Sequence, residues 1–296
     1  MQDSTSSRWV AAASAVVASA VAAPAVAATL YGLTTQNSIV VFDSSAPSVS
    51  LDGGFVMGLA PGEVLLAMDF RPATGQVYAV GSGDNLYTIA QTPLGDFQAS
   101  LVGNFAPPSN RGTSFAFDFN PAFMGGEFAR LISDTDNNRV ISGETGQYLL
   151  PVDKTPVFYA PGDPNEGANP NIAGIAYTNS LPGATSTQQF GIDATLGVLT
   201  TVANNAGTLE TVGSLGIMPL TNELGFDIDG PSGVAYAALQ NGSNSELYTI
   251  DLNTGAASLV GTIASGDIIR DITAVPEPAT LVLLGLAGLG LVRRRA

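Results

Sequence analysis

The chain has 296 residues, a formal net charge of −15 and 45% hydrophobic residues, and it contains neither cysteine nor histidine. The missing residue types exclude disulfide bonds, thiol nucleophiles, thiolate zinc sites and every catalytic triad or metal site that depends on histidine. The acidic balance argues against nucleic acid as a partner, because a negative surface repels phosphates. Only 12% of the residues are charged, so the chain is expected to bury a large core rather than to be disordered.

Residues 1–28 have the organisation of a secretory signal peptide. A polar head with Arg8 precedes an apolar run at residues 9–23, and small residues stand at Val26 and Ala28. We therefore expect signal peptidase to cut after Ala28 and the mature protein to be exported.

The stretch at residues 224–263 predicts four short β-strands. The apolar runs L-G-F-D-I, V-A-Y-A-A-L, E-L-Y-T-I and A-A-S-L-V-G-T-I are separated by the Gly, Asn, Asp and Pro residues that turns require. Similar units precede it, and L-Y-T-I occurs both at residues 86–89 and at residues 247–250. One four-stranded sheet cannot bury both of its faces, so a repeated unit predicts several sheets around a shared core.

First strands of this unit are predicted to begin near residues 65, 115, 172 and 224, and a lone strand is predicted at residues 268–275. The N-terminal segment offers only three strands, at residues 30–33, 38–43 and 48–51, and residues 155–160 are predicted to end the second full unit. The predicted fold class is all-β: a β-propeller of four-stranded blades, five in number. The N- and C-terminal strands would pair and close the ring. Six blades or an open solenoid are the alternatives.

Aspartates are predicted to share one position in four of the five first strands, while Ala176 holds that position in the remaining one. The four residues are Asp69, Asp118, Asp227 and Asp271. First strands of a propeller line its central channel, so these carboxylates would repel one another unless they took up protons or enclosed a cation. Without His or Cys, the expected cation is Ca²⁺. The alternative is that each Asp caps a turn within its own blade by accepting backbone N–H bonds.

The polar loop at residues 161–170 is the predicted ligand-facing loop, because functional residues concentrate on loops held by a rigid scaffold. It offers the oxygen-bearing side chains Asp163, Asn165, Glu166 and Asn169. A solvated connection between blades is the alternative. The segment D-T-D-N-N at residues 134–138 begins like a calcium-binding EF-hand loop but lacks the Gly and Glu of that motif, so it predicts a hairpin turn.

Residues 276–296 form a tail of three parts. Pro276, Glu277 and Pro278 make a stiff spacer, 14 uncharged residues follow, and three arginines stand near the end. The apolar run is shorter than the roughly 20 residues of an ordinary membrane span, and the basic end favours the cytoplasmic side. The tail is therefore predicted to be a transient membrane anchor that is cleaved at the exposed spacer.

The segment V-P-E-P-A-T, the Gly-rich apolar run and the terminal R-R-R closely resemble the PEP-CTERM sorting tail, which implies cleavage by an exosortase near Pro276, Glu277 and Pro278. Residues 29–275 resemble the bacterial domain of unknown function family 4394 (DUF4394). The resemblance rests on L-Y-G-L-T, L-L-A-M-D-F-R-P-A-T-G-Q-V-Y-A-V, F-D-F-N-P, G-I-A-Y-T-N and I-R-D-I. The segment after F-D-F-N-P, usually charged in that family, is A-F-M-G-G-E-F here.

These features predict an exported protein of the cell surface or the extracellular biofilm matrix. Its expected role is structural or carbohydrate-associated binding, with exopolysaccharide as the partner. The alternative is a secreted hydrolase that cleaves polysaccharide with paired carboxylates about 5–9 Å apart. No motif in the sequence selects such a pair, so the absence of catalytic signals favours a protein that is not an enzyme.

Overall fold

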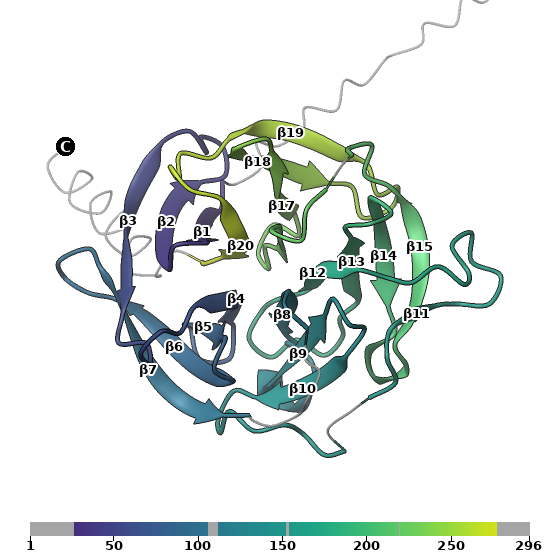
Figure 1. The fold of residues 1–296 in the computed structure, drawn as a ribbon, viewed down its shortest axis with the longest axis horizontal. Helices are drawn as coiled ribbons and strands as arrows, with labels where there is room; N and C mark the ends of the chain where they lie inside the picture. The colour runs from purple at the N-terminus through teal and green to yellow at the C-terminus, as the bar shows by residue number, and fades with distance from the viewer. Residues whose placement is uncertain (1–26, 106–111, 152–153, 219, 277–296) are drawn as a thin grey trace, which may run out of the picture.

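Alternating apolar runs and turn residues fold into an all-β, propeller-like structure, in which the strands surround a central axis (Figure 1). The computed structural model describes residues 27–105, 112–151, 154–218 and 220–276. Turns are sharp where the sequence supplies Gly or Asn; for example, Gly75 and Asn37 have φ angles of 69° and 57°. Such left-handed backbone is cheapest for these residue types.

The largest sheet has eight strands and contains both ends of the described chain. Its strands are β1 (Thr29–Thr34), β2 (Ser38–Asp43), β3 (Ser50–Met57), β4 (Leu65–Arg71), β5 (Gln76–Gly81), β6 (Asn85–Gln91), β7 (Phe97–Asn104) and β20 (Ile269–Ala274). Their order is β20-β1-β2-β3-β7-β6-β5-β4. The only parallel pair within this sheet joins β3 to β7, so the sheet divides there into two groups of four strands.

Three smaller sheets follow along the chain. The first contains β8 (Phe115–Phe119), β9 (Phe128–Ser133) and β10 (Asn138–Ser142). The second contains β11 (Phe158–Tyr159), β12 (Ile172–Tyr177), β13 (Gln189–Asp193), β14 (Val198–Val202) and β15 (Thr208–Ser214). The third contains β16 (Gly225–Ile228), β17 (Ala235–Asn241), β18 (Asn244–Ile250) and β19 (Ala257–Thr262). The short 3₁₀ helices η1 (Met124–Gly126) and η2 (Asn204–Ala206) lie in loops.

The strands β4, β8, β12, β16 and β20 form the inner layer of the structure. Each of them contacts the next in this order, and β20 contacts β4 (Figure 1). All residues of β8, β12 and β16 are buried, which explains why these segments are nearly continuous apolar runs. Apolar side chains between neighbouring sheets form the core, for instance Phe226 with Ile192, and Ile272 with Phe42.

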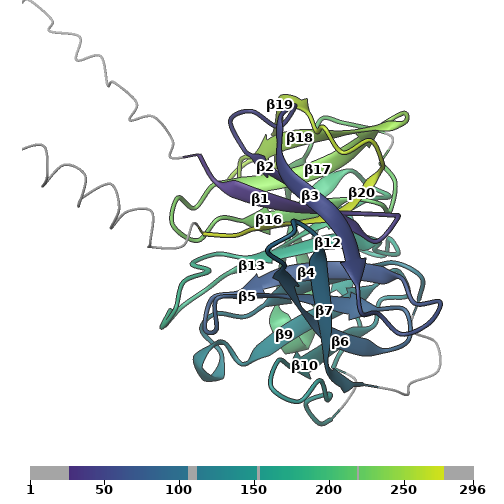
Figure 2. The same cartoon turned by 90° about the vertical axis from the view of Figure 1, so that its left-hand side faces the viewer.

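The predicted first strands are confirmed, because β4, β8, β12 and β16 begin within one residue of the expected positions. The predicted pairing of the last strand with the first is also confirmed: β20 is antiparallel to β1, with Ala274 opposite Leu30. Both ends of the described chain therefore lie at the same edge of the molecule (Figure 2). The hairpin at residues 134–138 is confirmed as the turn between β9 and β10.

The predicted strand at residues 155–160 is wrong in its partner and its length. Only Phe158–Tyr159 is a strand, and it pairs in parallel with β15 of the following sheet. Tyr148 instead makes an isolated bridge to Ile141 at the edge of the β8–β10 sheet, which has three strands. Pro156 cannot donate to a strand ladder, and Tyr159 packs into the core of the following sheet. The sheets thus contain eight, three, five and four strands and do not all follow the predicted unit.

Candidate functional site

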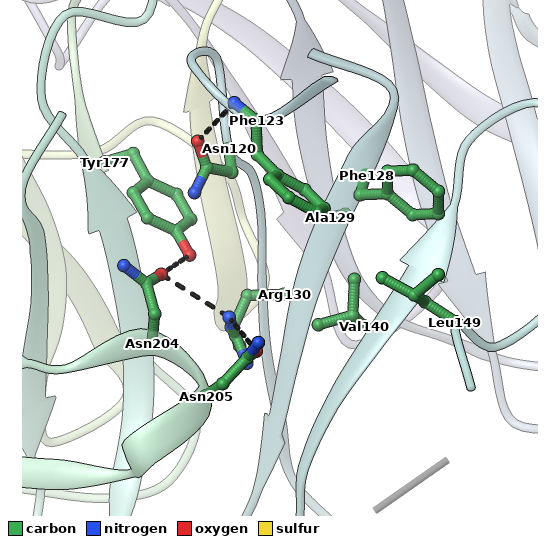
Figure 3. A pocket seen from close by; sticks show the side chains of 10 residues that line it. All are labelled: Asn120, Phe123, Phe128, Ala129, Arg130, Val140, Leu149, Tyr177, Asn204 and Asn205. Carbon is green, nitrogen blue, oxygen red and sulfur yellow. Dashed lines mark hydrogen bonds between the residues drawn. The ribbon is translucent and has the colours of Figure 1, made fainter. Parts of the chain in front are cut away.

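A cavity of about 150 Å³ lies between the β8–β10 sheet and the sheet that contains β12 (Figure 3). Strand β9 supplies three of its lining residues, and the others come from β10, the end of β12, η2 and connecting loops. The lining residues are Asn120, Phe123, Phe128, Ala129, Arg130, Val140, Leu149, Tyr177, Asn204 and Asn205. Figure 3 shows Tyr177, Asn204 and Asn205 on one side and Phe128, Val140 and Leu149 on the other, so a polar wall faces an apolar wall.

Among the described lining residues Arg130 is the one cationic side chain, and only 5% of its surface is exposed. Its Nη1 donates to Asn138 Oδ1 at 2.7 Å, and its Nη2 donates to Asn205 Oδ1 at 3.0 Å and Asn204 Oδ1 at 3.4 Å. Its Nε is buried without a hydrogen-bond partner in the described part of the chain. Asp118 is its cross-strand neighbour, but the two make no ion pair. A buried guanidinium without a carboxylate partner is unusual, because isolated buried charges are costly.

The amides around Arg130 turn their oxygens toward donors within the protein. Asn204 Oδ1 accepts from Tyr177 Oη at 2.6 Å as well as from Arg130, and Asn120 Oδ1 accepts from the N–H groups of Ala122 and Phe123. Burial raises the pKa of Tyr177, so its hydroxyl keeps the proton that it donates. Since these oxygens are engaged, the amide NH₂ groups of Asn204 and Asn205 remain for a ligand, and the polar wall offers mainly donors.

A second cluster lies at the centre of the inner layer, where Asp69, Asp118 and Asp227 meet. All three are buried, and one carboxylate oxygen of each lies within 4.8 Å of those of the others. Asp271, the fourth aspartate of the prediction, is buried nearby but does not belong to this group. The structure therefore brings three of the four predicted residues together at a spacing that a cation or shared protons would suit.

The hydrogen bonds of this cluster run from one inner strand to the next. Asp69 Oδ2 accepts from Phe119 N at 2.8 Å, Asp227 Oδ2 from Ala274 N at 2.6 Å, and Asp118 from Tyr177 N. The prediction that each aspartate caps a turn in its own blade is wrong for these three residues, because their carboxylates accept from backbone N–H groups of the neighbouring inner strand.

The same pattern corrects the predicted position of Asp271. Thr273 Oγ accepts from Phe70 N at 2.9 Å, so Thr273 occupies in β20 the position that Asp69 holds in β4. Asp271 lies two residues earlier, and its Oδ2 accepts from Met68 N at 2.8 Å. Residues two apart on a strand share a face, so the apolar pattern alone did not distinguish these two alignments.

The single hydroxyl proton of Thr273 limits how the hydrogen bonds of the cluster can be satisfied. Thr273 Oγ lies 3.0 Å from Asp69 Oδ1 and 3.1 Å from Asp227 Oδ2, and it already accepts the Phe70 N–H. Because the hydroxyl has one proton, one of the two carboxyl contacts requires a proton on the carboxyl itself. Burial raises the pKa of Asp227 to about 6, and burial together with the Asp227 charge raises the pKa of Asp69 well above its usual range. One proton on either carboxyl, with the Thr273 hydroxyl donating to the other, satisfies both contacts.

The predicted ligand loop at residues 161–170 uses its side chains to bind itself and β15. Asp163 Oδ2 accepts from Thr211 N at 2.6 Å, and Asp163 Oδ1 accepts from Asn165 N at 2.8 Å. Glu166 Oε2 accepts from Gly162 N at 2.8 Å, and Asn169 Nδ2 donates to a backbone oxygen. None of the four predicted residues lines the cavity that contains Arg130. Their observed contacts are those of a structural connection.

The predicted processing positions lie at the ends of the described chain. Ala28 is buried, donates its N–H to Ser44 Oγ at 2.9 Å and accepts from Ser44 N at 2.9 Å, so a cut after Ala28 would remove both bonds. Pro276 is exposed, while Glu277, Pro278 and the predicted signal and anchor segments lie outside the described residues. Within residues 27–276, as far as they are described, no helix is long and apolar enough to cross a membrane.

The structure of the chain is similar to several solved structures whose sequences have low identity to it. A structural genomics protein of unknown function from Bacteroides thetaiotaomicron is 13% identical, with a TM-score of 0.48, over 84% of this chain and 65% of its own. A protein from Lactobacillus plantarum is 17% identical, with a TM-score of 0.40, over 82% and 70%. The Dos1 propeller is 14% identical, with a TM-score of 0.40, over 82% and 59%. The chain thus spans less than two thirds of the first structure. No curated protein matches it.

Two family models match consecutive parts of the sequence and confirm both resemblances. Residues 274–296 match the PEP-CTERM protein-sorting motif. Residues 26–273, most of the chain, match the model described as Domain of unknown function (DUF4394). The chain therefore belongs to the DUF4394 family and ends in a PEP-CTERM sorting motif.

Proposed function

We propose that this protein is exported, processed by an exosortase and displayed at the cell surface or in the extracellular matrix, where it binds a sugar-sized ligand of an exopolysaccharide. The observation behind the binding role is the cavity in which Arg130, Tyr177 and two asparagine amides face an apolar wall. Sites for small molecules typically combine apolar walls with a small number of polar groups that point toward the ligand. A sugar ring suits such a cavity, since it has polar edges and apolar C–H faces.

The proposed route divides the chain into three parts. Residues 1–28 would be removed by signal peptidase, residues 29–275 would form the binding domain, and residues 276–296 would anchor the protein briefly in the membrane. The sorting motif at residues 274–296 supports the last step. The exposed position of Pro276, two residues after the end of β20, is consistent with access of a membrane enzyme to the spacer.

A five-bladed ring is part of this proposal. Five inner strands contact one another in sequence, and the eight-stranded sheet divides at the β3–β7 pair into two groups of four strands. In this arrangement β20, β1, β2 and β3 would be the blade that combines both ends of the domain. Closure by these strands would leave no open sheet edge at the inner layer.

The cavity supports binding better than hydrolysis. The described part of its lining offers no Asp or Glu, and so no pair of carboxylates of the kind that most glycoside hydrolases use. The clustered carboxylates Asp69, Asp118 and Asp227 are buried and engaged with backbone N–H groups of neighbouring strands or with Thr273. We therefore assign the cavity a binding role without turnover.

Replacing Asn204 by alanine is expected to weaken binding of the preferred monosaccharide by about tenfold, since the ligand loses an amide donor and Tyr177 loses its acceptor. Isothermal titration of the processed protein with a panel of neutral and acidic monosaccharides measures the effect. Asn253→Ala, in an exposed turn away from the cavity, is the control and should bind like the parent protein. If no sugar in the panel binds the parent protein, the binding role is wrong.

Replacing Pro276, Glu277 and Pro278 together by alanine is expected to leave the protein uncleaved in the inner membrane. The parent protein should lose its tail and reach the medium or the cell surface in a host that contains an exosortase, and should keep it in a matched host without one. Fractionation followed by mass spectrometry of the C-terminus measures both results. Equal release of the alanine variant and the parent would contradict sorting through this spacer.

A further inference from the structure

The cavity is a site of positive charge in an acidic protein. Residues 29–275 contain 23 acidic and six basic residues, yet none of the described residues that line this cavity is acidic. Arg130 lies in its wall, and Lys154 Nζ donates to the carbonyl oxygen of Leu149, another lining residue, at 3.0 Å. Arg130 is therefore the charged side chain among the described lining residues, and an anion is the group that complements it.

The hydrogen-bonding capacity of the wall leads to the same conclusion. The side-chain oxygens of Asn204 and Asn205 are occupied by Arg130, and Arg130 Nε has no partner within the described chain. The guanidinium of Arg130 fixes the orientation of the Asn204 and Asn205 amides, because their oxygens must face its N–H groups. A ligand in this cavity therefore meets N–H donors, and an oxygen-rich anion is the complementary group.

We infer that the ligand is an acidic sugar unit, a uronic acid residue of an exopolysaccharide, whose carboxylate is bound by Arg130 and the Asn204 and Asn205 amides. This inference rests on the proposed binding function and narrows it. A planar carboxylate matches one guanidinium, whereas a phosphate dianion would require cations beyond Arg130, which the described lining residues do not supply. Phe123 and Phe128 on the apolar side would contact the face of the sugar ring.

The test compares sugars that differ in one group. Isothermal titration of the processed protein with galacturonate and galactose, and with glucuronate and glucose, separates the carboxylate from the rest of the ring. At least one acid is expected to bind tenfold or more tightly than its neutral counterpart. Inorganic phosphate at the same concentration is expected to compete weakly.

Two variants test whether the preference for the acidic sugar depends on Arg130. Arg130→Gln is expected to abolish the preference for the acid, and Arg270→Gln, which removes the same charge from the Glu223 ion pair outside the cavity, is expected to keep it. If the buried Arg130→Gln variant fails to fold, Asn205→Asp serves instead. Asn205 is exposed and already accepts from Arg130, so its carboxylate would occupy the guanidinium and should also abolish the preference.

The outcomes distinguish this inference from the function on which it rests. Neutral and acidic sugars that bind equally would overturn the uronic acid assignment and leave the sugar site in place. A stronger competition by phosphate than by either acid would also overturn it. If no sugar binds, both the site and its ligand class are wrong.

Discussion

Truncating the chain after Ser265 is expected to abolish cooperative folding, because this removes β20 from the inner layer. Strand β20 pairs with β1 and contacts β4 and β16, and Ile269 and Ile272 are no more than 1% exposed. Burial of two isoleucine side chains contributes roughly 3–6 kcal/mol, and the strand ladder and the bonds of Asp271 and Thr273 add to this. The loss approaches the roughly 5–15 kcal/mol of net stability that a domain has.

Circular dichroism during thermal unfolding and size-exclusion chromatography measure this result. Truncation after Pro276 is the matched control, since it also removes residues 277–296 but retains β20, and it should unfold with the midpoint of the longer chain. The chain that ends at Ser265 should aggregate or unfold without a cooperative transition. A cooperative transition near the midpoint of the control would show that the β1–β20 pair is dispensable.

The packing around β20 explains why its loss should spread through the inner layer. A Cβ atom on Gly225 of β16 would lie 2.2 Å from Ile272 N, so the two inner strands approach more closely than any other residue at this position would permit. Met68 and Phe70 of β4 donate their backbone N–H groups to Asp271 and Thr273 on the opposite side. Without β20, both neighbouring inner strands lose backbone contacts and leave buried polar groups unsatisfied.

The strands of the inner layer could be predicted because each combines an apolar run with turn residues at its end. F-D-F-N-P and I-A-G-I-A-Y show this pattern locally, and the structure places β8 and β12 there. The sheet to which a strand belongs is a long-range property. Residues 155–160 therefore looked like the end of one unit, whereas Phe158 and Tyr159 pair with Thr208 and Leu209 of the next sheet.

The candidate site was less accessible to sequence reasoning, because its residues come from four separate segments. Asn120, Arg130, Tyr177 and Asn204 share no motif and meet only when the β8–β10 sheet packs beside β12 and η2. One signal is nevertheless present in the sequence: the unusual segment A-F-M-G-G-E-F, which supplies two aromatic lining residues.

The alignment of the aspartates shows a different limit. The sequence pattern correctly predicted that Asp69, Asp118 and Asp227 meet at one depth of the inner layer. It could not choose between Asp271 and Thr273 in β20, because both side chains lie on the same face. Only the backbone bonds between neighbouring inner strands, such as Phe70 N to Thr273 Oγ, distinguish the two residues.

The central carboxyl cluster is expected to make the protein more stable in mild acid than at neutral pH. Burial raises the pKa values of Asp69, Asp118 and Asp271 well above the usual range, and raises that of Asp227 to about 6. Asp229 adds to the shift of Asp227. Above pH 4 the unfolded chain therefore gives up protons that the folded protein keeps. The resulting stabilisation is complete below about pH 4 and is lost as the pH rises through 6 and beyond.

The expected size of this effect follows from Asp227 alone. A pKa of about 6 in the folded protein corresponds to a loss on the order of 3 kcal/mol between pH 4 and pH 7, and the raised pKa values of the other three carboxyls act in the same direction. We expect the thermal midpoint to be about 5–10 °C higher at pH 5 than at pH 8. Asp163 and Asp251, whose pKa values are lowered, act in the opposite direction but only at lower pH.

Asp118→Asn tests the cluster directly, because the amide keeps an oxygen that can accept from Tyr177 N and removes one carboxyl from the group. The variant should raise the thermal midpoint at pH 8 and make this midpoint depend less on pH, whereas Asp267→Asn, at an exposed position, should change neither.

Thermal unfolding in the presence of calcium or EDTA distinguishes shared protons from a bound cation in the carboxyl cluster. If calcium raises the midpoint at pH 8 and EDTA lowers it, a cation compensates the carboxylates and the predicted loss of stability between pH 5 and pH 8 is wrong. If the midpoint instead falls with pH and ignores both reagents, shared protons hold the inner strands together at this point.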